Sequence, residues 1–194
     1  MARINPRSIT VKARRRLGRN ARYTRMSIRM ATEIFNNAKR ELLSEFDSHP
    51  VTREIERGPL AQSNFLERGN LFSFIGFEEG SDPIGDLRNF LERSIRIRNL
   101  GVGQGDERRF RISIPSRPDF VENFPFPEFW DSGSWVLKIT EGMSGISHFL
   151  AIHERGRSGG GIQSQGTLGS NGFSGTEYLA NMLENFKSNV RQIR

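Results

Sequence analysis

The sequence predicts a single α+β domain, with an antiparallel sheet of about four or five strands packed with a long N-terminal helix and a C-terminal helix. Near both ends of the chain, apolar residues recur every three or four positions, a spacing typical of amphipathic helices. Between these segments, short stretches alternate apolar and polar residues, as strands with one buried face do. The 194 residues suit one domain with its own core.

The first helix is predicted over residues 23–46. Its apolar residues form one stripe, made of Ala31, Phe35, Ala38, Leu42 and Phe46. The helix should end at His49, because a residue that precedes proline is pushed out of helical geometry. One or two further helical turns are expected over residues 51–57, closed by Gly58 and Pro59.

Two more helices are predicted from capping residues and apolar stripes. Asp82 is a good N-cap and Pro83 is favoured at the first helical position, so a helix should run from there to about Arg93. A C-terminal helix is predicted over residues 176–193, where Ser174 and Glu177 fit a capping box. Its stripe comprises Leu179, Met182, Leu183, Phe186, Val190 and Ile193.

Five segments between the helices are predicted as strands: residues 71–77, 94–100, 109–114, 135–140 and 148–154. In the second and third of them, apolar residues alternate with arginine or serine, which predicts one buried face. The glycine-rich stretch 101–106 would join these two as a hairpin, and the last two segments would form another. Helices are expected to cover the apolar face of the sheet.

The expected organisation is a basic extended arm at residues 1–22 and one domain at 23–194, with long loops at 115–131 and 155–174. Loops this long are uncommon in a compact domain unless they bind something or move. The first is rich in proline and phenylalanine, and an exposed patch of aromatic rings indicates a partner surface. A subunit interface is therefore predicted at Phe120, Phe124, Phe126 and Phe129.

Charge is concentrated in the N-terminal segment. Residues 1–29 hold ten basic side chains and no acidic one, whereas the rest of the chain holds 19 basic and 22 acidic side chains, a net charge of −3. Such an arm can neutralise phosphates or pair with carboxylates of another protein, and the sequence does not separate these uses. The predicted partner or nucleic-acid contacts are Arg3, Arg7, Lys12, Arg14, Arg15, Arg16, Arg19, Arg22 and Arg25.

The sequence offers little for catalysis. The absence of cysteine excludes disulfides, thiolate zinc sites and cysteine nucleophiles. His148 and His153 lie five apart on an expected strand and would point to opposite faces, so they do not predict a metal site. The glycine-rich stretch 155–161 lacks the Gly-Lys-Ser/Thr of a P-loop. We predict no catalytic residue, metal or cofactor, and thus no enzyme.

Several segments resemble neck, or tail-completion, proteins of tailed bacteriophages, from about residue 30 to the C-terminus. These segments are HPVTREIERG at 49–58, GNLFSFIGF at 69–77, DPI at 82–84, WDSGSWV at 130–136 and RSG at 157–159. The resemblance implies a structural protein that forms a ring, commonly six-fold and sometimes twelve-fold, between portal and tail tube. It implies no catalytic residues. The arm is longer and more basic than this family leads us to expect.

The predicted function is therefore that of a virion protein, made in the host cytoplasm, whose ring in the head-to-tail connector joins the portal side to the tail around the DNA channel. The expected partners are copies of itself (a hexamer favoured over a dodecamer), neighbouring connector and tail proteins, and DNA in the channel. No membrane is expected as a partner, since no apolar run approaches the ~20 residues of a membrane helix. No small-molecule substrate is expected either. The alternatives are a basic nucleic-acid-binding protein whose arm contacts phosphates, and a nuclease.

Overall fold

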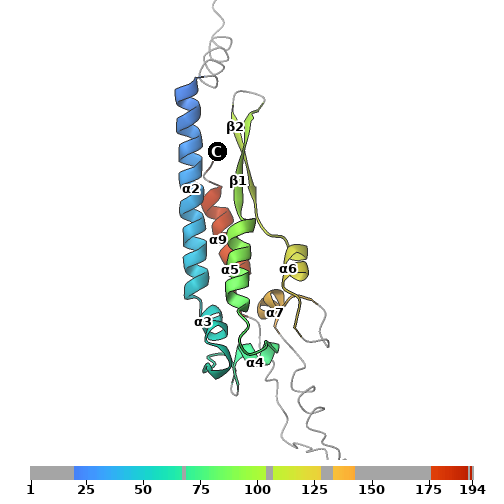
Figure 1. The fold of residues 1–194 in the computed structure, drawn as a ribbon. Helices are drawn as coiled ribbons and strands as arrows, with labels where there is room; N and C mark the ends of the chain where they lie inside the picture. The colour runs from blue at the N-terminus through green and yellow to red at the C-terminus, as the bar shows by residue number, and fades with distance from the viewer. Residues whose placement is uncertain are drawn as a thin grey trace, which may run out of the picture.

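The computed structural model describes residues 20–66, 69–103, 107–127, 133–142, 176–191 and 193. In this part of the chain, seven α-helices and one 3₁₀ turn accompany a two-stranded antiparallel sheet. Figure 1 shows the long helix α2 (Ala21–Ser48) beside the hairpin of β1 (Arg96–Val102) and β2 (Arg108–Ser113), with α9 (Leu179–Val190) between them. No helix in these ranges is both long and apolar enough to cross a membrane.

The buried apolar face predicted for the first helix is confirmed in α2. Asn20 caps its start, where Oδ1 accepts hydrogen bonds from the backbone N–H groups of Arg22 (2.9 Å) and Tyr23 (3.3 Å). The residues that it buries are Ala31, Phe35, Ala38, Leu42 and Phe46. The helix ends at His49, whose backbone is extended before Pro50, as expected. Pro50 opens α3 (Pro50–Glu56), and the 3₁₀ turn Gly58–Leu60 follows.

Helices α9 and α5 (Pro83–Ser94) complete the main packing against α2. The ring of Phe186 in α9 meets the ring of Phe35 edge-on, with centroids 5.9 Å apart. Asp82 caps α5 as predicted, since Oδ1 accepts from the N–H of Gly85 at 2.8 Å. Lys39 of α2 donates to the carbonyl oxygens of Glu92 (2.5 Å) and Ile95 (3.0 Å), and so fixes the end of α5 where the chain enters β1.

A buried polar pair ties the start of α9 to α3. The hydroxyls of Tyr178 and Thr52 lie 2.8 Å apart, and both residues are almost fully buried. Burial raises the pKa of the Tyr178 phenol well above its ordinary value. The ring of His49 lies against that of Tyr178 with centroids 5.0 Å apart, and burial lowers the pKa of this histidine. These contacts connect three segments that are distant in sequence.

Residues 71–77, expected as a strand, instead contain a short helix, α4 (Leu71–Ile75). Asn70 caps it through a hydrogen bond from the N–H of Ser73 at 2.9 Å, and Gly76 ends it with a left-handed φ of 90°. The buried carboxylate of Glu54 accepts the N–H of Leu71 at 2.8 Å, which satisfies another free donor at the helix start. Capping thus decides the conformation of this apolar run.

The hairpin between residues 94–100 and 109–114 is confirmed, with strand bounds shifted by one or two residues. Ile97 pairs with Ile112, and Arg98 pairs with Arg111. A register shift between Asn99 and Gly101 marks a bulge.

The predicted sheet of four or five strands is wrong, because β1 and β2 are the only strands in the described part of the chain. Residues 135–140 belong to helix α7 (Trp135–Glu141), which buries Trp135, Val136 and Ile139. Apolar runs this short fit the spacing of a strand and of a helix alike. Residues 148–154 lie outside the described residues. The described part of the domain is mainly helical and carries one β-hairpin beside α2.

The first predicted loop contains helix α6 (Arg117–Asn123), and three of the loop's phenylalanines pack inward. Phe120, Phe124 and Phe126 are 4%, 7% and 8% exposed. Phe124 lies edge-on to Phe90 at 5.1 Å and to Trp135 at 6.2 Å between ring centroids. These three rings belong to the core of the single chain and form no exposed patch. Phe129 and the second expected loop, 155–174, lie outside the described residues.

Candidate partner-binding surface

The predicted arm contacts that the structure places lie on the first turns of α2. This helix begins two residues earlier than expected, so Arg22 is helical, and Arg25 follows one turn later. Both are exposed, as is Arg29. Spacings of three and four put these arginines on one face of the helix. Arg3, Arg7, Lys12, Arg14, Arg15, Arg16 and Arg19 lie outside the described residues.

An apolar stripe runs beside these arginines. Tyr23, Met26 and Met30 follow Arg22, Arg25 and Arg29 by one residue each, and they are 50%, 62% and 52% exposed. The first buried residue of α2 is Ala31, so the helix runs about ten residues ahead of its packing against the core. We call the residues Tyr23, Met26 and Met30 the apolar stripe. An exposed apolar surface of this kind indicates a partner.

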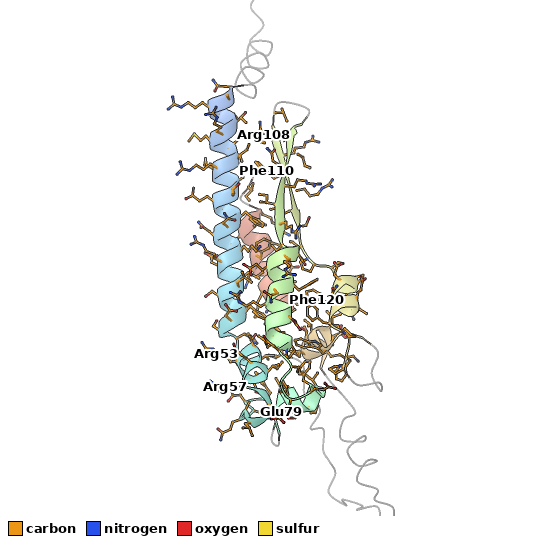
Figure 2. All side chains as sticks on the ribbon, in the orientation of Figure 1. Arg53, Arg57, Glu79, Arg108, Phe110 and Phe120 are labelled. Atoms are coloured by element: carbon orange, nitrogen blue, oxygen red, sulfur yellow. The ribbon has the colours of Figure 1, made fainter. Side chains whose placement is uncertain are left out.

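The far end of the hairpin is tied to the same part of α2. An Nη atom of Arg108 donates to Oγ1 of Thr24 at 3.0 Å. Figure 2 shows Arg108 and Phe110 on the hairpin beside the first turns of α2. The apolar stripe and the hairpin therefore belong to one end of the molecule.

The hairpin has two chemically distinct faces because strand residues alternate in direction. The face toward α2 carries Arg108, Phe110 and Ile112 on β2, all partly buried, together with Ile97 on β1. Exposed arginines occupy the opposite face: Arg96 and Arg98 on β1, with Arg109 and Arg111 on β2. We call this second surface the arginine face.

None of these four arginines makes an ion pair with a described residue. Ion pairs in the described ranges lie elsewhere, for example between Arg88 and Asp47 (2.9 Å) and between Arg117 and Glu141 (2.6 Å). The guanidinium of Arg96 donates to the carbonyl oxygen of Arg93. The arginine face therefore carries four positive charges without a carboxylate partner from the described part of the chain.

Sequence reasoning found the alternation of these arginines with apolar residues but assigned them no function. The net charge of −3 over residues 30–194 obscured a local concentration of positive charge. The available signal was that four arginines alternate on two strands expected to pair.

The described residues offer no evident catalytic centre. They contain no group of three His, Asp or Glu side chains that could hold a metal ion. A groove of about 540 Å³ beside α5 is lined by Asp86, Asn89 and Arg93 together with aromatic rings. His49 accepts the N–H of Val51 through Nδ1 (3.3 Å), which is a structural contact. His148 and His153 lie outside the described residues.

No protein-family model, curated protein or solved structure was found to match this chain.

Proposed function

We propose that this protein is a structural subunit that assembles into a ring in the head-to-tail connector of a tailed phage. The observation that carries the assembly is the apolar stripe on α2. The phage connector is supported by the resemblance of the segments at 49–58, 69–77 and 130–136.

The hairpin lies beside the first turns of α2, yet Tyr23, Met26 and Met30 stay at least half exposed. Most helix stability in proteins comes from packing an apolar face. At 1.5 Å per residue, residues 21–30 extend about 15 Å along the helix axis ahead of the core. A neighbouring subunit that covers the apolar stripe would stabilise this segment.

A copy of the same chain suits this role. In a ring, the apolar stripe of one protomer would contact a different surface of the next, which is a head-to-tail contact. Such contacts produce closed rings when the rotation between subunits closes. The arginines at 22, 25 and 29 border the stripe, and charged residues commonly form the rim of an interface.

The test measures the mass of the full chain in solution by light scattering and images the particles by electron microscopy. A closed ring, six-fold in the favoured case, supports the proposal. Met26→Glu should dissociate the ring without unfolding the protomer, because it places a charge in the apolar contact. The matched control is Leu60→Glu, at a residue 94% exposed in the 3₁₀ turn.

The proposal fails if the chain stays monomeric at all concentrations. It also fails if Met26→Glu leaves the ring intact while circular dichroism shows an unchanged fold. Dissociation by Leu60→Glu alone would place the subunit contact at the other end of the protomer and refute the role of α2.

A further inference from the structure

We propose that the arginine face of the β1–β2 hairpin binds the phosphate backbone of double-stranded DNA. This contact goes beyond ring assembly, and it is separate from the N-terminal arm. It is carried by the alignment of Arg96, Arg98, Arg109 and Arg111 on one exposed face.

The arginine face holds an electrostatic conflict that an anion would relieve. Arg98 and Arg111 are direct cross-strand partners. Side chains at such positions have Cβ atoms about 4.5–5.5 Å apart, and like charges there destabilise the sheet. No described carboxylate pairs with either of them, so a bound phosphate would supply a counter-charge that this pair lacks among the described residues.

The composition of the arginine face favours phosphates. The guanidinium fork of arginine binds phosphate oxygens in a bidentate manner. The strand partners of Arg96 and Arg109 on this face are Ser113 and Gly101, and the exposed Leu100 lies in the bulge beside Gly101. Glycine allows a backbone to approach closely, and a serine hydroxyl can donate to phosphate. The centre of the face is the Arg98–Arg111 pair, whereas a protein partner would be expected to meet apolar or aromatic residues at the centre of its contact.

The shape of the hairpin favours duplex DNA over other nucleic acids. A two-stranded ribbon fits the major groove of B-form DNA, which is about 12 Å wide. The major groove of A-form RNA is too deep and narrow for this approach. Single strands are usually held by aromatic stacking, and the one aromatic residue of the hairpin strands, Phe110, lies on the opposite face. Contacts to phosphates alone predict binding without sequence preference.

The tie between Arg108 and Thr24 prepares the hairpin for this contact. It holds the hairpin beside α2, where Arg22, Arg25 and Arg29 add positive charge at the same end of the molecule. A surface ordered before binding loses less conformational entropy when it meets its ligand.

The experiment measures binding of the full chain to a short DNA duplex by fluorescence anisotropy over a series of salt concentrations. Each phosphate contact contributes about 0.9 to the slope of log K against log salt concentration. The double variant Arg98→Gln/Arg111→Gln should therefore reduce the slope by about 1.8. The control is Arg53→Gln/Arg57→Gln, which removes the same charge from exposed residues of the α3 region, at the other end of the molecule (Figure 2), and should leave the slope unchanged.

Three outcomes would overturn the inference. The chain could fail to bind duplex DNA even at low salt. The Arg98→Gln/Arg111→Gln variant could retain the wild-type slope, which would assign all DNA contacts to other residues. Poly-glutamate could bind more tightly than the duplex and lose that affinity in the same variant, which would identify an acidic protein as the partner.

Folding and assembly are followed on the same samples. The melting temperature of the double variant should equal or exceed that of the wild type, since the cross-strand repulsion is removed. Light scattering reports the ring separately. If the double variant forms the ring but shows a smaller salt slope for DNA binding, the result supports this inference. If the wild-type chain is monomeric but its salt slope still falls in the double variant, the result refutes only the proposed ring.

Discussion

The buried hydrogen bond between Tyr178 and Thr52 predicts a large coupling between two positions that are far apart in sequence. The two hydroxyls are 2.8 Å apart, and the residues are 0% and 1% exposed. Tyr178→Phe removes one hydroxyl and leaves that of Thr52 buried without its partner. Loss of one partner of a buried hydrogen bond costs about 1–3 kcal/mol. At about 2–4 °C per kcal/mol for a chain of this size, the melting temperature should fall by several degrees.

The reverse substitution and the double variant complete the cycle. Thr52→Val strands the Tyr178 hydroxyl and should cost a similar amount. Tyr178→Phe/Thr52→Val removes both polar groups, and replacing both partners by apolar groups of the same shape is nearly neutral. The double variant should therefore be more stable than the sum of the single effects predicts, by about 0.5–3 kcal/mol.

The assay is thermal unfolding at one protein concentration, because any oligomer would make the melting temperature depend on concentration. Thr32→Val is the control: it makes the same change as Thr52→Val at a half-buried residue of α2 outside the apolar stripe, and only a small shift is expected. Additive effects of the two single substitutions would refute the reasoning, since they would mean that the hydroxyls do not share a hydrogen bond.

Two further predictions concern other contacts of the core. Burial lowers the pKa of His49, so protonating it costs more in the folded chain than in the unfolded chain. The contribution of His49 to stability should be constant above its ordinary pKa of 6.5 and should be lost as pH drops below it. His49→Asn, which preserves a capping side chain, should flatten this dependence in urea unfolding followed at several pH values, and an unchanged profile would contradict the assignment. Phe186→Ala should cost about 3–5 kcal/mol, because the ring is 1% exposed and packs on Phe35. Val121→Ala, at a residue 43% exposed, serves as its control in the same denaturant titration, and equal losses would rule out a core role for Phe186.

The long elements could be predicted because each has several independent signals. Helix α2 has five buried residues at helical spacing and a proline just beyond its end. Helix α5 has the Asp82-Pro83 start, and the hairpin has two alternating segments around glycines. Repetition of a signal over many residues makes the period unambiguous.

The short elements could not be predicted in the same way. In α4 and α7 the apolar runs are too short to show a period, and their helical state depends on caps such as Asn70 and on packing against distant rings. Phe124 provides an example: its contacts are Phe90 and Trp135, and neither lies in the predicted loop. Tertiary contacts of this kind are not visible in a local pattern.

Among the surface residues, those clustered in sequence could be predicted, and those brought together by folding could not. The arm arginines stood out because they are clustered in the sequence, and two of the predicted ones, Arg22 and Arg25, are on α2. The arginine face depends on pairing between strands, which brings Arg98 next to Arg111 across 13 positions of sequence. The apolar stripe is defined by the exposed fractions of Tyr23, Met26 and Met30, which only a three-dimensional structure shows.

Helix α2 is connected to the hairpin by hydrogen bonds at two separate places. Lys39 holds the base of the hairpin, and Thr24 holds Arg108 near its tip. The two attachment points are 15 residues apart on α2, or about 22 Å along the helix axis. A movement of the hairpin away from α2 would have to break the hydrogen bonds at both points. Because α2 also packs on α9, the hairpin is connected through α2 to the core.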